Sequence, residues 1–157
     1  MTIRVGINGF GRMGRLGLRA GWGRAGFAVV RVNEISTDAA GSAHLLQFDS
    51  VHGAWSVSCS AEGATMQVDG QAIAYGSNAA IGDTDWSGCD IVIEATGKHH
   101  KKPESLQAYF DQGVKKVIVA APTEGALNIV YGINHDEYDP SRHHLVTAAS
   151  CTTNCLA

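Results

Sequence analysis

Apolar residues along the chain occur either in short continuous runs or at helical spacing. Residues 3–7 and 27–32 form two continuous runs rich in β-branched side chains, a pattern typical of parallel strands covered on both faces. Between them, from residue 12, apolar residues recur at helical spacing after a glycine-rich turn. The residues that we place on one face of this helix are Met13, Leu16, Gly17 and Ala20. Strand, turn, helix and strand together predict a βαβ unit.

The same rhythm resumes after a different middle section. Residues 57–73 alternate around Asp69-Gly70, a pair that supplies the positive φ angles of a tight hairpin, so this section predicts antiparallel strands. Further strands are predicted at residues 91–93, 117–119, 129–133 and 145–147, and further helices at residues 38–48 and 104–112. The predicted fold class is α/β, a Rossmann-type, mostly parallel sheet with helices on both faces and a small antiparallel excursion.

The chain is long enough for one domain with a continuous core, at 157 residues. We predict that residues 1–149 form this domain and that residues 150–157 begin a second one. The segment Cys155-Leu156-Ala157 continues a helix with no capping residue, glycine or polar tail to end it. We therefore expect the second domain to be truncated.

Charge and composition favour a small-molecule partner. The 12 basic and 15 acidic residues are interspersed, the net charge is −3, and this balance provides no strong field for nucleic acid or an anionic membrane. No apolar run approaches the roughly 18 residues of a membrane span, and no signal-peptide region follows Met1, so we expect a cytoplasmic protein. Four unevenly spaced cysteines, Cys59, Cys89, Cys151 and Cys155, predict free thiols rather than a disulfide scaffold.

The first turn carries a dinucleotide-binding pattern. Gly9, Gly11 and Gly14 have the G-x-G-x-x-G spacing directly after a strand and before a helix, where helix N–H groups and the helix dipole attract a pyrophosphate. Glu34, at the end of the second strand, can accept hydrogen bonds from both ribose hydroxyls, and its charge would repel a 2′-phosphate. The pattern favours NAD over NADP. The alternative is that these glycines only form a tight turn.

A cysteine near the end of the chain is the candidate nucleophile. Cys151 follows an apolar strand and opens a predicted helix, where the dipole and free N–H groups favour a thiolate. Three alternatives stay open: a buried thiol, half of a metal or disulfide pair with Cys155, and a redox sensor built on both cysteines. Two ligands fall short of the four of structural zinc, so no metal is predicted. Cys155 itself is interpreted as a small buried residue.

A general base for Cys151 does not stand out among the seven histidines. The segment from His99 to Lys102 is most simply an exposed loop, although it follows a strand's carboxyl end, where ligands of such sheets lie. We expect the base to be missing from these 157 residues.

Several segments together resemble glyceraldehyde-3-phosphate dehydrogenases in order and spacing, over the whole chain. The segments that carry the resemblance are GINGFGR at residues 6–12, DSVHG at 49–53, EATG at 94–97 and ASCTTNCLA at 149–157. The resemblance implies an NAD-dependent, phosphorylating aldehyde dehydrogenase: Cys151 attacks the aldehyde, hydride passes to NAD, and inorganic phosphate cleaves the thioester. It also implies a general-base histidine beyond Ala157 and a homotetramer for the full-length protein.

The resemblance also implies roles for individual residues. Those that match the pyrophosphate and ribose site are Gly9, Phe10, Gly11, Arg12, Met13 and Glu34. Thr96, Gly97 and Ala121 match residues near the ribose and nicotinamide end, and Ser150 and Thr152 match positions that help to hold the attacking phosphate. From the residues alone, the side chain of Phe10 is better interpreted as packing, and Arg12 fits a phosphate contact or a solvated helix face.

Some positions depart from the family pattern. Glu34 replaces the usual aspartate, Ser77 replaces an arginine beside the adenine, Lys98-His99-His100 replaces a segment with phenylalanine, and Ala121-Pro122 replaces serine-proline. These changes suggest a divergent paralogue. Residues 44–48 and 125–130 resemble the bacterial branch associated with arsenic resistance, in which arsenate takes the place of phosphate. The chain by itself is expected to be inactive, and the alternative function is an NAD-binding module without turnover.

Overall fold

Parallel strands form most of one nine-stranded sheet, with the order β10-β11-β9-β8-β1-β2-β7-β6-β5. The structure is a computed structural model that describes residues 2–157, so Met1 lies outside the described part. The strands of this sheet are β1 (Ile3–Asn8), β2 (Phe27–Asn33), β5 (Cys59–Glu62), β6 (Thr65–Val68), β7 (Gln71–Gly76), β8 (Ile91–Glu94), β9 (Lys116–Val119), β10 (Leu127–Asn128) and β11 (Leu145–Thr147). From β10 to β7 neighbouring strands are parallel. The predicted Rossmann-type α/β fold is confirmed.

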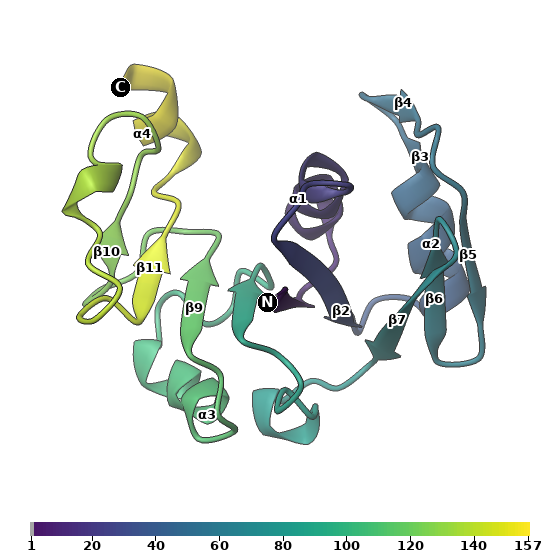
Figure 1. Cartoon of the computed structure of the whole chain (residues 1–157), viewed down its shortest axis with the longest axis horizontal. Helices are drawn as coiled ribbons and strands as arrows, with labels where there is room; N and C mark the ends of the chain where they lie inside the picture. Colours follow the sequence, from purple (N-terminus) through teal and green to yellow (C-terminus); the bar gives the residue numbers. More distant parts are fainter. Residues whose placement is uncertain (1) are drawn as a thin grey trace.

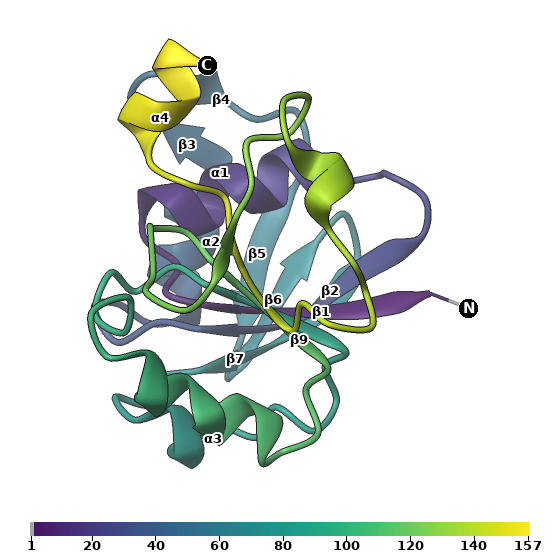
Figure 2. The same ribbon diagram turned by 90° about the vertical axis from the view of Figure 1, so that its left-hand side faces the viewer.

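Helices cover both faces of the sheet, as Figures 1 and 2 show. On one side lie α1 (Arg12–Gly21) and α2 (Ala39–Gln47), and on the other lies α3 (Gln107–Phe110). Each side has its own core. Leu18, Val32 and Leu46 belong to the first, while Trp86 and Tyr109 belong to the second, and all five side chains are almost fully buried.

The predicted antiparallel excursion extends the main sheet at one edge. Strands β5, β6 and β7 are antiparallel neighbours, and the turn between β6 and β7 is formed by Asp69 and Gly70 with φ angles of 51° and 74°. These positive angles are those that the Asp-Gly pair predicts. A separate two-stranded sheet pairs β3 (Phe48–Asp49) with β4 (Gly53–Ala54).

Two predicted elements differ from the structure. The strand expected at residues 129–133 is absent: β10 ends at Asn128, and the Asn134 side chain accepts from the Val130 N–H and donates to the Asn128 carbonyl, which turns the chain back. The helix expected at residues 104–112 begins instead as a 3₁₀ turn, Pro103–Leu106, that continues into α3. The proline supplies the φ angle of a first helical turn but no N–H donor.

The apolar face of α1 that carries Met13, Leu16, Gly17 and Ala20 is not the face that the structure buries. Gly14 and Leu18 are its buried residues, whereas Met13 is 63% exposed. A Cβ atom on Gly14 would lie 2.2 Å from the Gly9 carbonyl oxygen, so the helix packs closely on the turn through this glycine. The close packing at Gly14 orients the helix so that Met13 faces outward.

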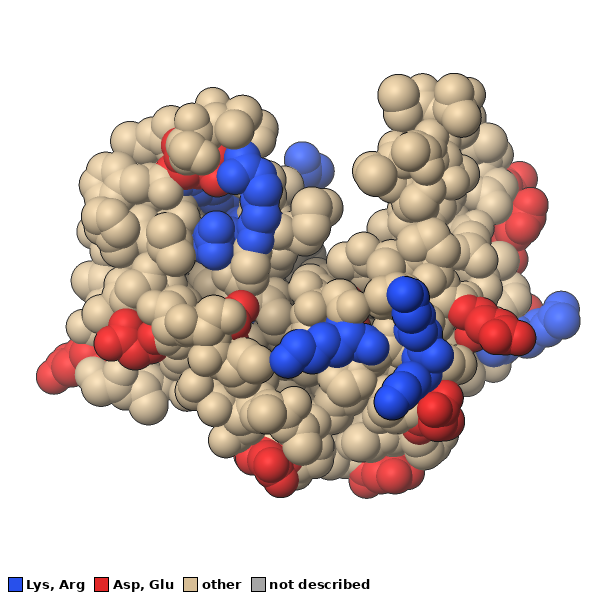
Figure 3. Space-filling model, turned by 180° about the vertical axis from the view of Figure 1, so that it is seen from behind, with Lys and Arg blue, Asp and Glu red and all other residues tan. Residues whose placement is uncertain are grey.

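The surface of the molecule has two concave regions. Between α1 and the neighbouring strands lies an apolar groove of about 240 Å³, with Ile91 and Ile93 of β8 and Ile118 of β9 in its lining. The outer surface is hollowed between the segment that carries α4 (Cys151–Leu156) and the one that carries β3 and β4 (Figure 3). Charged side chains lie on the wall with β3 and β4, whereas the arm that carries α4 is uncharged where it faces the hollow. Within residues 2–157 no helix has the length and apolar character needed to cross a membrane.

Candidate functional site

The glycine turn lies at the carboxyl end of β1 and leads into α1. Gly9 has a φ of 89°, and a Cβ atom there would lie 2.5 Å from the Thr96 nitrogen, so only glycine fits. Gly14 is required by its contact with the Gly9 carbonyl. Gly11 differs, because no atom lies within 4 Å of the position that its Cβ would take. Protein atoms therefore pack tightly against the turn at Gly9 and Gly14, whereas the space beside Gly11 is free for a ligand.

The N-terminus of α1 is available to an anion. Gly11 is the N-cap residue and provides no side-chain cap, and no acidic residue lies in the first turn. The first N–H groups of a helix have no partner within the helix, and the dipole gives this end a partial positive charge. A phosphate that approaches on the open side of Gly11 would meet these N–H groups.

Glu34 is held beside this turn by backbone donors. One carboxylate oxygen accepts from the Phe10 N–H at 2.8 Å, and the other accepts from the Ser36 N–H at 2.8 Å. Partial burial disfavours the charged form, but the hydrogen bonds from Ser36, Phe10 and Ile35 outweigh it and hold the pKa of Glu34 below its ordinary value. The carboxylate keeps lone pairs for further donors, because each oxygen can accept more than one hydrogen bond.

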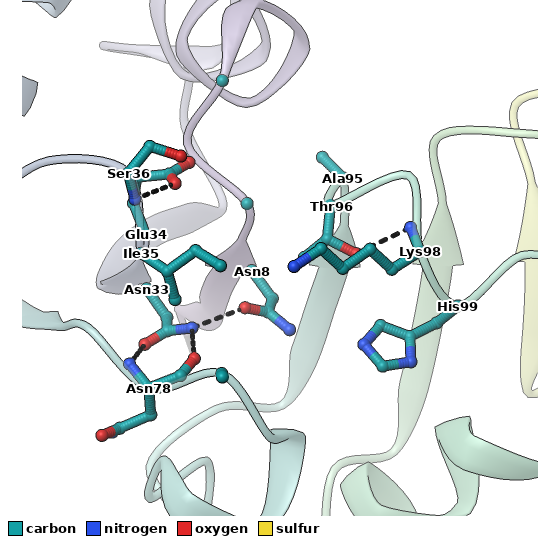
Figure 4. A pocket seen from close by; sticks show the side chains of 13 residues that line it. Asn8, Asn33, Glu34, Ile35, Ser36, Asn78, Ala95, Thr96, Lys98 and His99 are labelled. Carbon is teal, nitrogen blue, oxygen red and sulfur yellow. Dashed lines mark hydrogen bonds between the residues drawn. The ribbon is translucent and has the colours of Figure 1, made fainter.

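A cavity of about 250 Å³ lies between the glycine turn and Glu34. Its lining comes from the ends of β1 and β2, from Asn78 and Ala79, and from the loop after β8. Figure 4 shows the Lys98 side chain extended toward this cavity and the His99 ring at its edge. The site lies at the carboxyl ends of parallel strands, where sheets of this kind bind ligands.

A second cavity, of about 170 Å³, lies on the other side of the turn. It shares Ala95 and Thr96 with the first cavity and extends along the ends of β8 and β9. The residues in its lining are Met13, Glu94, Ala95, Thr96, Gly97, His100, Val119, Ala120 and Ala121. Since β9 is the neighbour of β11, this cavity lies toward the strand that precedes Cys151. The two cavities together can accept an elongated ligand with a central anionic group.

The candidate nucleophile is the first residue of α4. Cys151 is exposed, and the Ser150 hydroxyl caps the helix by accepting from the Thr153 N–H at 3.0 Å. The hydroxyl oxygens of Ser150 and Thr152 are 2.9 Å apart, but neither residue lines the two cavities. Within residues 2–157 no hydrogen bond joins Cys151 to a histidine. The interpretation of Cys155 as buried is wrong, because this thiol is exposed.

Comparison with known proteins assigns the family. The sequence profile described as "Glyceraldehyde 3-phosphate dehydrogenase, NAD binding domain" matches residues 3–102. The chain belongs to the glyceraldehyde-3-phosphate dehydrogenase family. It is 52% identical to glyceraldehyde-3-phosphate dehydrogenase 3 of Nostoc sp. over 160 residues, 43% identical to the enzyme of Geobacillus stearothermophilus and 42% identical to enzyme 1 of Bacillus subtilis. These alignments cover 100% of the chain and 47% of each relative, so the chain spans about half their length.

NAD is the cofactor of this dehydrogenase-family domain, and the described residues fit it. A side chain at Gly11 would fill the space that a pyrophosphate needs, and the α1 N-terminus offers uncapped N–H groups beside it. Glu34 lies at one end of the first cavity, with oxygens able to accept from a ribose. Bound there, the adenosine half would occupy the first cavity and the nicotinamide half the second.

The structure brings together most of the predicted cofactor residues of the dehydrogenase domain. Those that line a cavity are Gly9, Gly11, Met13, Glu34, Thr96, Gly97 and Ala121. The Phe10 side chain lies in the core, 1% exposed, and does not line the cavities. Its backbone N–H donates to the Glu34 carboxylate. Arg12 lines neither cavity; its guanidinium pairs with Asp49 at 3.1 Å, and its contact with a phosphate stays a prediction.

Sequence reasoning missed several residues of the first cavity. Asn33 donates to the Asn8 side chain at 2.8 Å and accepts from the Asn78 N–H at 2.9 Å, so these amides join the ends of β1 and β2 to a later loop (Figure 4). Lys98 and His99 also line this cavity instead of facing only solvent. The signal that could have found Asn8 and Asn33 is their position, because each is the last residue of a parallel strand.

Proposed function

We propose that this chain is the NAD-binding and nucleophile-bearing part of a phosphorylating glyceraldehyde-3-phosphate dehydrogenase. The observation that carries the proposal is the pair of neighbouring cavities at the carboxyl ends of the strands, which share Ala95 and Thr96. Glu34 lies at one end of the pair, and at the other lies the end of β9, the neighbour of the strand that precedes Cys151. The relatives named above are glyceraldehyde-3-phosphate dehydrogenases, which supports the aldehyde as substrate.

In the proposed reaction, the thiolate of Cys151 attacks the aldehyde carbon, and the carbonyl oxygen takes a proton to give a thiohemiacetal. NAD, when bound, supplies a hydride acceptor. Loss of hydride from carbon and of the hydroxyl proton leaves a thioester on Cys151, and a phosphate oxygen then attacks the acyl carbon while the thiolate leaves. Ser150 and Thr152, on exposed backbone at the start of α4, are proposed to hold that phosphate.

The acyl acceptor is proposed to be phosphate or arsenate, which are similar oxyanions. The resemblance of residues 44–48 and 125–130 to the arsenic-resistance branch supports arsenate, and the family name of the relatives supports the phosphorylating enzyme. We further propose a homotetramer for the full-length protein and the cytoplasm as its compartment, where the four free thiols would stay reduced.

By themselves, the 157 residues are proposed to bind NAD with little turnover, because no histidine base is hydrogen-bonded to Cys151 within residues 2–157. The apolar groove beside α1 is proposed to be covered by another part of the full-length protein. An uncovered apolar groove favours self-association, so light scattering should show concentration-dependent association.

Calorimetric titration of the chain with NAD tests the binding function, and NADH formation with glyceraldehyde 3-phosphate tests turnover. The second assay uses phosphate in one arm and arsenate in the other, with Cys151→Ser as the control. NAD binding without turnover supports an NAD-binding part, and turnover lost in Cys151→Ser would show that no downstream base is needed. Absence of NAD binding at millimolar concentration contradicts the proposed function.

A further inference from the structure

The carboxylate of Glu94 is the most deeply buried acidic group near the proposed cofactor site, with 2% of the residue exposed. One oxygen accepts from the Asn8 amide at 3.1 Å and from the Tyr109 hydroxyl at 2.5 Å. The other accepts from the backbone N–H and the hydroxyl of Thr96, at 2.9 Å and 2.5 Å. A carboxylate has about four acceptor sites, so these donors satisfy Glu94 completely.

The donors themselves are held in place. Asn8 donates also to the Tyr109 oxygen at 2.6 Å, and its own carbonyl accepts from Asn33 at 2.8 Å. Burial and the nearby charge of Glu94 raise the pKa of Tyr109 above its ordinary value, so the phenol remains a donor. The groups that contact the Glu94 oxygens are thus all donors, and the network holds the carboxylate in place without any rearrangement.

No cation neutralises this carboxylate. The ion pairs within residues 2–157 join Arg4 and Lys115 to Asp90 and Arg12 to Asp49, and none includes Glu94. Hydrogen bonds from neutral groups stabilise a charge without cancelling its field at a distance. In a low-dielectric interior that field is screened far less than at the surface.

The field of Glu94 acts on the second cavity, because Glu94 is part of its lining. The other titratable side chain in that lining is His100, whereas Glu34 and Lys98 line the first cavity. A dinucleotide with its adenosine ribose at Glu34 and its pyrophosphate at Gly11 places its nicotinamide half in this second cavity. This placement rests on the proposed function.

We infer that Glu94 makes the site prefer the oxidised cofactor over the reduced one. The nicotinamide ring carries a positive charge in NAD⁺ and none in NADH, while the rest of the molecule is the same. A fixed negative charge beneath the cavity attracts the first ring and not the second. Glu94 is thus a specificity-determining residue that acts by charge, in addition to holding Thr96 and Asn8 in position.

The test is the affinity of the 157-residue chain for NAD⁺, NADH and ADP-ribose, measured by calorimetry for wild type and Glu94→Gln. We expect the ratio of NAD⁺ to NADH affinity to fall on the order of tenfold in Glu94→Gln. The affinity for ADP-ribose, which lacks the nicotinamide ring, should change by the same factor as the affinity for NADH. If the role of Glu94 were purely structural, Glu94→Gln would lower the affinity for all three ligands by the same factor, and that result would overturn the inference.

Two further variants separate charge from structure. Tyr109→Phe removes one donor but keeps the carboxylate, so the NAD⁺ to NADH ratio should stay at the wild-type value. The double variant Asn8→Asp with Glu94→Gln returns one carboxylate to the network and lets the glutamine amide donate to it, so it should restore most of the ratio. A ratio that stays low in the double variant contradicts a charge effect.

If Glu94→Gln does not fold, the wild-type chain still decides the inference. It must bind NAD⁺ more tightly than NADH, and equal or tighter binding of NADH overturns it. If wild type binds none of the three ligands, the proposed function itself fails. Binding of all three with a ratio that Glu94→Gln leaves unchanged defeats only the role of Glu94.

Discussion

Replacing Gly9 with alanine should destabilise the fold, whereas replacing Gly11 should weaken NAD binding and leave the fold nearly intact. At Gly9 the new methyl group would lie 2.5 Å from the Thr96 nitrogen and 2.6 Å from the Ala95 carbonyl carbon, and the φ of 89° is unfavourable for alanine. A left-handed backbone costs about 1–2 kcal/mol for a non-glycine residue, and displacement of the backbone adds a similar amount. We expect a loss of about 3 kcal/mol in the free energy of unfolding.

At Gly11 the φ is −65° and no atom lies within 4 Å of the Cβ position, so alanine meets no steric conflict in the ligand-free fold. The expected cost is at most about 1 kcal/mol, because alanine is a poorer N-cap residue than glycine. The methyl group would occupy the open side of the turn, where the pyrophosphate approaches α1. NAD affinity should therefore fall by at least about tenfold, which is about 1.4 kcal/mol.

Thermal unfolding followed by circular dichroism, and NAD titration of both variants, check this pair. For a chain of this size about 3 kcal/mol corresponds to a fall in the melting temperature of roughly 6–12 °C for Gly9→Ala. The reasoning is refuted if Gly9→Ala melts like wild type, or if Gly11→Ala binds NAD with undiminished affinity.

Three other measurements test the electrostatics and the thiols. Glu34→Gln should weaken NAD binding by about tenfold and narrow the preference for NAD over NADP, as titration with both would show; unchanged selectivity would contradict the role of its charge. The hydrogen bond from Arg4 holds the pKa of Asp90 below its ordinary value, so its stabilisation is present above about pH 4 and is lost as the pH falls further. The melting temperatures of wild type and Asp90→Asn should therefore differ at pH 7 and converge in acid, and a constant difference would refute this. Iodoacetamide should label exposed Cys151 much faster than Cys89, whose pKa burial raises to about 11, and mass spectrometry showing uniform labelling would contradict it.

Local features of the sequence determined the βαβ rhythm and the position of the glycine turn. The turn could be predicted because Gly9 and Gly14 each have a steric reason that depends on nearby backbone. The Asp69-Gly70 hairpin was predictable for the same kind of reason, since its positive φ angles are a local requirement. The family motifs added the proposed role of Cys151 as nucleophile, which the local sequence alone left open among several alternatives.

Tertiary structure decided what depends on contacts between distant segments. Asn8 and Glu94 lie on different strands, and only the parallel register of β1 and β8 makes them a bonded pair. The outward orientation of Met13 likewise follows from packing at Gly14, which periodicity cannot reveal. Residues 129–133 have the apolar character of a strand, but side-chain bonds from Asn134 turn the backbone away from the sheet. The hydrophobic pattern of the sequence indicates which residues prefer burial. The hydrogen-bond partner of each polar group is determined only when the strands assemble into the sheet.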